Sequence, residues 1–225
     1  MEKKLGKVIT IDGPAGGGKS TAARILADQL GFEYLDTGAM YRSVALLGIR
    51  ANIDWGDPDA LVRLARQHKI KYDQGRIFLD GEDVSEAIRS SEVTAKTRYS
   101  ADNPEIRALL VRLQQKFAEG HHLVTEGRDQ GTVVFPNAWR KFYLTAGAHE
   151  RARRRMLDLE ARGEQPDFDA LLRQIEERDQ RDASRAVGPL RCPEDAQTIN
   201  SDGKSISEVV AEMFSAAGGR GEEGN

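Results

Sequence analysis

The chain has 225 residues, of which 31% are charged and 39% are hydrophobic, and its formal net charge is −3. This length suits one ordinary core with a smaller lobe, and the charge balance argues against a nucleic acid polymer as a partner. The apolar runs are too short for a signal peptide or a membrane span, and the single Cys192 excludes an internal disulfide. We therefore expect a cytoplasmic protein with no membrane partner.

The first elements of the chain predict a phosphate-binding loop. Residues 7–12 have the β-branched apolar pattern of a buried strand, and residues 20–30 have the spacing of an amphipathic helix that Gly31 ends. The stretch between them fits the G-x-x-x-x-G-K-[ST] pattern of loops that bind nucleoside triphosphates. The residues of this predicted loop are Gly13, Pro14, Ala15, Gly16, Gly17, Gly18, Lys19, Ser20 and Thr21.

The chemistry of phosphate binding explains these residue types. Phosphates must lie against backbone N–H groups at the positive end of a helix, and glycines leave room for them there. Lys19 supplies a mobile positive charge for the β- and γ-phosphates, and the hydroxyl of Ser20 can ligate Mg²⁺. A glycine-rich turn of chance origin is the alternative, which the flanking strand and helix disfavour.

The next elements are a strand expected at residues 32–35 and a helix for which Thr37 is the expected cap. A strand–helix alternation so early in the chain predicts a parallel sheet with helices on both faces. Ligands bind at the carboxyl edge of such sheets, and Arg42, one turn into the helix, would lie near that edge.

Residues 52–100 differ in pattern from their neighbours and predict a small α+β insertion, with a helix at 60–68 and a hairpin of strands 70–72 and 76–79. The core elements then resume, with helices expected at 104–119, 148–161, 168–187 and 205–216 and strands at 122–125, 141–144 and 198–199. Residues 218–225 are rich in glycine, and we expect them to be disordered.

Several arginines are candidates for one anionic site. Arg178, Arg181 and Arg185 are spaced three and four residues apart, so they would share a face of the helix expected at 168–187. Arg42 and Arg128 each follow the end of a strand in a turn that contains glycine, where a guanidinium can bind phosphate through two N–H groups.

Other charged side chains are expected to be structural. Arginines on helices commonly pair with neighbouring carboxylates at the surface, and we expect this of Arg153 and Arg173. The chain shows no evident catalytic His–Asp pair. The histidines expected to be structural are His68, His121, His122 and His149.

Together these motifs resemble those of the bacterial cytidylate kinase family, whose members are P-loop nucleoside monophosphate kinases. Besides the phosphate loop, the stretches that carry the resemblance are 35–42, 80–85, 88–89, 126–129, 131–136 and 178–185, and the resemblance spans residues 5–215. It implies an α/β fold of the P-loop NTPase type, with a parallel five-stranded sheet flanked by helices. It also implies a core at 1–51, 101–151 and 171–217, a CMP-binding insertion at 52–100 and a short helical lid at 152–170.

The resemblance implies an enzyme of pyrimidine nucleotide metabolism that transfers the γ-phosphoryl of ATP to CMP, and to dCMP, with Mg²⁺ accompanying the ATP. The products would be CDP or dCDP and ADP. This reaction depends on positioning and charge neutralisation, and the acceptor phosphate is already largely ionised at neutral pH, so it needs no general base. No long unpaired apolar helix face is evident, and we expect a monomer.

The resemblance also implies a role for each candidate residue. Residues 13–21 would bind the phosphates of ATP, while Arg151 and Arg155 would meet the adenine and the transferring phosphoryl group. The residues implied to contact CMP are Arg42 and Arg128 at its phosphate, Arg178 and Asp182 at its ribose, and Thr37, Arg107, Asp129 and Arg185 at its cytosine. The residues implied to be catalytic are Lys19, Arg128, Arg155 and Arg178, with Ser20 as the metal ligand. Arg98 departs from the family pattern of a small polar residue near the ribose, so no contact is assigned to it.

Three alternatives stay open. The first is a kinase for another acceptor, such as UMP, AMP or shikimate, against which Asp129 argues because a carboxylate accepts a hydrogen bond from the cytosine amino group. The second is a GTPase switch, which would need an Asn-Lys-x-Asp segment to recognise guanine. The third is a nucleotide-binding scaffold without activity, against which the intact Lys19 and Ser20 argue.

Overall fold

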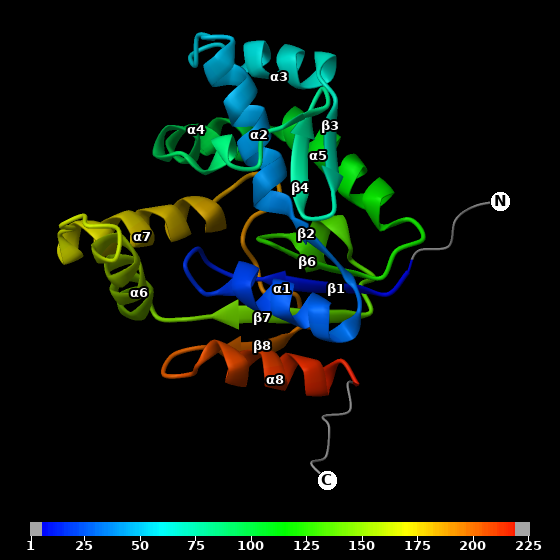
Figure 1. Cartoon of the computed structure of the whole chain (residues 1–225), viewed down its shortest axis with the longest axis vertical. Helices are drawn as coiled ribbons and strands as arrows, with labels where there is room; N and C mark the ends of the chain where they lie inside the picture. The colour runs from blue at the N-terminus through cyan, green and yellow to red at the C-terminus, as the bar shows by residue number, and fades with distance from the viewer. Residues whose placement is uncertain (1–5, 219–225) are drawn as a thin grey trace. The chain divides into compact units, whose positions relative to one another are not determined.

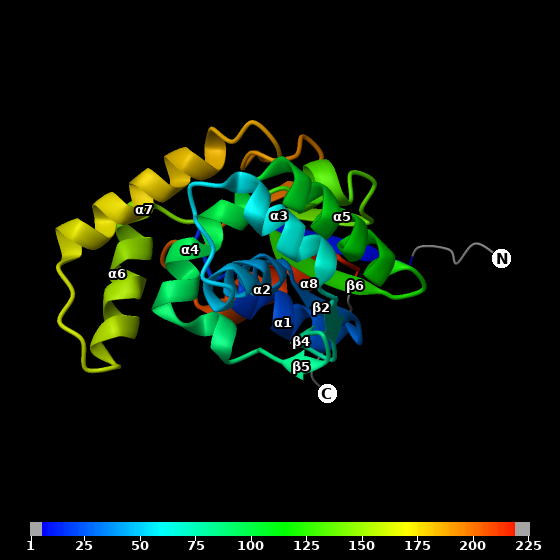
Figure 2. The ribbon, with the colours of Figure 1, turned by 90° about the horizontal axis from the view of Figure 1, so that it is seen from above.

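The computed structural model describes residues 6–218, which form two units. The P-loop unit comprises Lys7–Glu33 and the chain from His122 onward, and the helical unit comprises Tyr34–His121 with Gly6. Figures 1 and 2 follow the elements of each unit along the chain by colour. The tail expected to be disordered lies outside the described residues apart from Gly218. The expected insertion and lid boundaries remain predictions.

A five-stranded sheet has the order β2-β6-β1-β7-β8; four of its strands belong to the P-loop unit, and the edge strand β2 runs from Glu33 into the chain range of the helical unit. Its strands are β1 (Val8–Asp12), β2 (Glu33–Asp36), β6 (Leu123–Gly127), β7 (Arg140–Thr145) and β8 (Gln197–Asn200). The β1–β6, β1–β7 and β7–β8 pairs are parallel, and every residue of β1 and β6 is buried. Burial on both faces explains why β1 reads as a nearly continuous apolar run, and the sheet confirms the predicted fold class.

The helices of this unit lie close to the ranges expected from the sequence. They are α1 (Lys19–Leu30), α6 (Ala148–Glu160), α7 (Phe168–Ala183) and α8 (Ile206–Ala216). Helix α1 contacts β6 and α8, while α6 and α7 lie side by side as a helical hairpin (Figures 1 and 2). Among the residues that the structure describes, no helix is long and apolar enough to span a membrane.

Helix α7 ends earlier than predicted. The sequence pattern places the helix at 168–187, but its last residue is Ala183. The backbone N–H of Leu190 donates to the carbonyl oxygen of Asp182 at 2.8 Å, so the returning chain satisfies a carbonyl that a longer helix would have used. Arg185 therefore lies beyond the helix, and the prediction that it continues the helical face of Arg178 and Arg181 is wrong.

The helical unit combines a small antiparallel sheet with four helices. Its strands, in the order β3-β4-β5, are β3 (Ile70–Asp73), β4 (Arg76–Leu79) and β5 (Glu82–Asp83). Its helices are α2 (Thr37–Arg50), α3 (Pro58–Gln67), α4 (Ser91–Ala101) and α5 (Pro104–Ala118), with a 3₁₀ turn η1 at Ala87–Arg89. The predicted hairpin is confirmed, and its Gln74-Gly75 turn has the two positive φ angles that a tight hairpin requires.

The cap of α2 differs from the expected one. Thr37 is the first residue of the helix, and the cap is Asp36, whose side chain accepts a hydrogen bond from the backbone N–H of Ala39 at 2.8 Å. The carboxylate at the end of β2 reaches the third N–H of the helix from one position upstream, so the hydroxyl of Thr37 is not needed there. The prediction that Thr37 caps this helix is therefore wrong.

Candidate functional site

The phosphate loop joins β1 to α1 and packs closely against β7. A Cβ added to Gly13, which has a φ of +147°, would lie 2.0 Å from the carbonyl oxygen of Leu144 in β7. Only glycine fits there without moving the loop away from the sheet. Gly18 precedes the first turn of α1 with a φ of +85° and has no side chain to cap the helix, so that turn is suited to binding an anion.

Lys19 lies inside the loop and is buried. Its Nζ donates a hydrogen bond to the carbonyl oxygen of Pro14 at 2.6 Å. Burial, together with the charges of Arg128 and Arg178, lowers the pKa of Lys19 to about 7, although Glu126 favours the charged form. Its ammonium is therefore poised to gain stability from any polyanion that enters the loop.

Ser20 lies beside a carboxylate that the sequence interpretation missed. The Ser20 hydroxyl donates a hydrogen bond at 2.8 Å to Oε1 of Glu126, which is buried in β6. Hydroxyl and carboxylate oxygens are the ligand types that Mg²⁺ takes, so this pair fits a magnesium ion that a nucleotide brings. Glu126 stands within the 126–129 stretch that carries the family resemblance, where it was assigned no role, and only the sheet pairing brings it to α1.

The turn after β6 is fixed by Asp12, a second residue that the sequence interpretation missed. The buried Asp12 carboxylate accepts the backbone N–H groups of Gln130 at 2.8 Å and Gly131 at 2.7 Å. Burial outweighs these hydrogen bonds and raises the pKa of Asp12 to about 6. The two N–H groups open a π-helical turn, Gln130–Val134, of a kind that is common at functional sites. Asp12 thus ties the turn that carries Asp129 to the strand before the phosphate loop.

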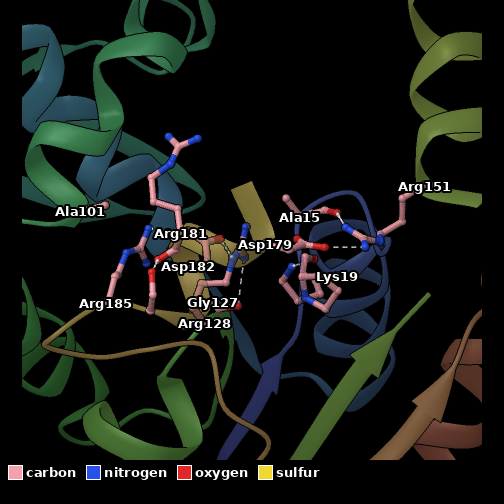
Figure 3. A network of polar contacts seen from close by, with 12 residues as sticks. Ala15, Lys19, Ala101, Gly127, Arg128, Arg151, Asp179, Arg181, Asp182 and Arg185 are labelled. Carbon is pink, nitrogen blue, oxygen red and sulfur yellow. Dashed lines mark hydrogen bonds and ion pairs between the residues drawn. The ribbon is translucent and has the colours of Figure 1, made fainter. Parts of the chain in front are cut away.

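The carboxylate of Asp182 forms ion pairs with two of the candidate arginines (Figure 3). Asp182 Oδ2 pairs with Nε of Arg128 at 2.8 Å, and its Oδ1 pairs with a terminal nitrogen of Arg185 at 2.6 Å. Burial alone would raise the pKa of Asp182, but the charges of Arg128, Arg185 and Arg178 outweigh it and lower that pKa. The structure thus brings together the turn after β6 and the C-terminal part of α7, while the single anionic site expected for all the candidate arginines stays a prediction.

Arg178 and Arg155 have different surroundings. Desolvation by surrounding protein and the charge of Arg128 lower the pKa of Arg178, which lies one turn before Asp182 on α7. Arg155 is exposed on α6, one turn beyond the buried Arg151. Arg153 pairs with Glu150 at 2.8 Å on the exposed face of α6, as expected of a surface arginine.

Three further candidates lie in the helical unit. Arg42 on α2 pairs with Asp36 at 2.9 Å, and a Cβ added to Gly38 would lie 2.9 Å from its guanidinium. Thr37 is buried in the same first turn. Arg107 on α5 is buried, donates to the carbonyl of Ala101 at 3.0 Å and lies 5.6 Å from the centre of the Tyr41 ring. These contacts of Arg42 and Arg107 thus lie within their own unit.

The histidines lie outside these groups. His122 accepts the backbone N–H of Lys7 at 2.9 Å, and His149 lies 4.8 Å from the ring of Phe168. His68 and Asp80 do form a 2.5 Å pair, which the sequence did not reveal, but it lies at the exposed end of the β3–β4 hairpin. Its position is consistent with a structural role.

The family model described as cytidylate kinase matches residues 9–218. The chain belongs to the cytidylate kinase family. Among the family's members, the cytidylate kinase of Caldanaerobacter subterraneus subsp. tengcongensis is 47% identical over 208 residues, which is 92% of this chain and 93% of the relative. The cytidylate kinase of Vibrio cholerae serotype O1 is 46% identical over 211 residues, 92% and 94% of the two chains.

A solved structure resembles this chain in fold but has low sequence identity to it. An uncharacterised protein from Eubacterium ventriosum superimposes with a TM-score of 0.50 at 11% identity, covering 95% of this chain and 99% of the other. The sequence relatives therefore establish the cytidylate kinase family for this chain, and the structural neighbour supports its architecture.

Proposed function

We propose that the chain transfers the γ-phosphoryl of ATP to CMP, and also to dCMP, giving ADP and CDP or dCDP. The observation that carries the proposal is the Asp182 carboxylate shared by Arg128 and Arg185 in the unit that holds the phosphate loop. An inorganic phosphate site would need only the loop. A cluster of arginines held beside it suits a reaction in which a phosphoryl group moves between two anions.

On the donor side, residues 13–21 bind the phosphates of ATP. Lys19 exchanges the carbonyl of Pro14 for the β- and γ-phosphates, because an anion offers its ammonium more stabilisation than a neutral carbonyl does. Arg151 meets the adenine, while Arg155 and Arg178 neutralise charge on the transferring phosphoryl group. Positioned charges of this kind act without reorganisation during the reaction.

On the acceptor side, Arg42 and Arg128 hold the phosphate of CMP, which attacks as an anion and needs no base because its second pKa is near ~6. Arg178 and Asp182 bind the ribose. The residues proposed to recognise the cytosine are Thr37, Arg107, Asp129 and Arg185. The lobe at 52–100 would carry the acceptor, and the segment 152–170 would act as a lid that excludes water.

Magnesium is proposed to accompany ATP. The hydroxyl of Ser20 would ligate the ion, and the carboxylate of Glu126, now hydrogen-bonded to that hydroxyl, would hold the ion's water shell. When bound, Mg²⁺ neutralises charge on the β- and γ-phosphates. The proposed assembly is a monomer without nucleic acid, and the proposed compartment is the cytoplasm, since the single Cys192 is a free thiol.

An assay that couples ADP release to NADH oxidation tests the proposal directly. CMP, dCMP, UMP, AMP and shikimate are supplied in turn with Mg²⁺-ATP, and turnover should be fastest with CMP or dCMP. A faster rate with another acceptor would reassign the substrate. GTP hydrolysis without any acceptor would favour a switch, and nucleotide binding without turnover would favour a scaffold.

The lowered pKa of Lys19 predicts that ATP binding takes up a proton. Free Lys19 is protonated below its pKa of about 7 and neutral above it, whereas the phosphates of bound ATP favour the charged form and raise that pKa. At pH 8 we expect uptake of about one proton per ATP, and above pH 7 the affinity should fall by up to about tenfold per pH unit. Calorimetry in buffers with different ionisation enthalpies measures the uptake. Lys19→Met should remove it, and a proton count near zero at pH 8 in the unmodified chain would contradict the prediction.

A further inference from the structure

Arg151 is held by every nitrogen of its guanidinium group. It lies in the first turn of α6, and its side chain is only 4% exposed. Nε donates to the carbonyl of Ala146 at 2.9 Å. One terminal nitrogen donates to the carbonyl of Ala15 at 3.1 Å, and the other pairs with Oδ2 of Asp179 at 2.6 Å (Figure 3). The guanidinium therefore connects the end of β7, the phosphate loop and α7.

The aliphatic part of Arg151 also covers the loop. A Cβ added to Gly16 would lie 3.5–3.9 Å from Cβ, Cγ and Cδ of Arg151. Gly16 has a φ of +78°, so its backbone conformation already depends on the lack of a side chain. Arg151 thus lies against the loop through both its stem and its charged head, and its position decides how the loop is supported on this side.

Asp179 supplies the charged contact of the buried Arg151 guanidinium, whose other two acceptors are the neutral carbonyls of Ala146 and Ala15. It lies on α7 directly after Arg178, and its side chain is 25% exposed. Its Oδ2 accepts from Arg151, whereas its Oδ1 is buried and has no hydrogen-bond donor among residues 6–218. The carboxylate is therefore committed to Arg151, and removing its charge would leave a buried cation with two neutral carbonyl partners.

We propose that Asp179 is a positioning residue for the donor side of the site. Its carboxylate holds Arg151 against the carbonyl of Ala15, which fixes the phosphate loop relative to α6 and to the helix that carries Arg178. This inference deepens the proposed function and rests on it for the identity of ATP as the donor. The competing interpretation is that Asp179 acts on ATP only as a nearby negative charge, which would repel the phosphates.

The two interpretations predict opposite signs for Asp179→Asn. If Asp179 positions Arg151, the variant should bind ATP ~10-fold more weakly and show a raised KM for ATP with little change in the KM for CMP. If Asp179 only repels phosphate, the same variant should bind ATP more tightly. Asp179→Glu, which keeps the carboxylate, should restore part of the affinity. Glu177→Gln removes the same charge from the exposed face of α7 and should change neither KM.

A double-mutant cycle with Arg151→Ala identifies the contact itself. Titration calorimetry with ADP and with a non-hydrolysable ATP analogue measures affinity without turnover, so the result is independent of whether CMP is the acceptor. In a chain that already carries Arg151→Ala, Asp179→Asn should lower the affinity for these nucleotides by less than a further twofold. An equal loss with and without Arg151, tighter binding, or equal increases in both KM values would overturn the proposal. If Asp179→Asn does not fold, Asp179→Glu takes its place in the cycle, and an equal effect of Asp179→Glu on ADP affinity with and without Arg151 would overturn the proposal.

Discussion

Lys19→Ala is expected to abolish turnover while leaving CMP binding largely intact. Lys19 is assigned to the phosphates of ATP, and one positioned donor to developing charge is worth ~100- to ~1000-fold in kcat. CMP is assigned to other side chains, among which Arg128 is held by Asp182 without help from Lys19. Steady-state kinetics measures the loss, and calorimetry with CMP alone measures the affinity that should survive.

The folded state should tolerate this substitution. Because burial lowers the pKa of Lys19 from 10.5 to about 7, the folded protein disfavours the charged amine, and below pH 7 it carries that cost in full. The cost declines as the pH rises from 7 toward 10.5, so Lys19→Ala should unfold at an equal or higher temperature near pH 6.5. Lys71→Ala, at an exposed position of β3, is the matched control and should retain full activity. A collapse of CMP affinity with surviving turnover would show that the two nucleotide sites are wrongly assigned.

Asp129→Ala is expected to reduce the preference for CMP over UMP. Asp129 is buried in the turn that Asp12 fixes, and its carboxylate only accepts hydrogen bonds. CMP presents an amino donor at C4, whereas UMP presents an oxygen there, so UMP would place two desolvated acceptors face to face. Mispairing of this kind costs on the order of 2–5 kcal/mol, which corresponds to a preference for CMP over UMP of ~30- to ~5000-fold. The kcat/KM for CMP should therefore fall sharply while that for UMP falls less or rises.

The competing interpretation is that Asp129 merely orients Arg128. The structure provides other partners for Arg128, since its Nε pairs with Asp182 and a terminal nitrogen donates to the carbonyl of Gly127. If Asp129 only oriented Arg128, Asp129→Ala would lower kcat/KM equally for CMP and UMP, because both nucleotides rely on Arg128 to bind their phosphate. An unchanged CMP/UMP ratio would therefore end the proposed role in base recognition. Asp129→Asn adds a donor and should shift the ratio further toward UMP, while Asp28→Ala on the exposed face of α1 should leave it unchanged.

The sequence predicted those parts of the fold that depend on local pattern. The phosphate loop, the β3–β4 hairpin and α8 follow from glycine, turn and periodic apolar residues that act within a few positions, although Ser205, expected as the first residue of that helix, is its cap. Helix α4 was missed because only Val93 and Ser100 are buried along it, so the chain shows almost no apolar stripe. The end of α7 was missed because the chain turns back there, and the N–H of Leu190, beyond the helix, takes up the carbonyl of Asp182.

In the site, too, residues that belong to local motifs could be predicted, whereas residues placed by tertiary contacts could not. Lys19 and Arg128 stand in motifs, and their residue types alone indicate phosphate chemistry. Asp12 and Glu126 gain their contacts only when β1, β6 and α1 assemble, because their partners lie more than a hundred residues away. No local pattern distinguishes Asp12 from other acidic residues at strand ends, and the 126–129 stretch by itself assigns Glu126 no role, so the contacts of both became visible only in three dimensions.

The Asp182 carboxylate also limits how this chain can vary. Its two oxygens are each committed to a different arginine, and one of these, Arg128, lies 54 positions away in the sequence. Replacing Asp182 removes the carboxylate that both arginines share, and replacing either arginine removes the charged donor of one buried carboxylate oxygen, in a place with little water to screen the remaining charge. Positions 128, 182 and 185 should therefore covary among relatives. Transferring a different residue from a relative to one of these positions should preserve activity only when the residues at the other two positions are transferred with it.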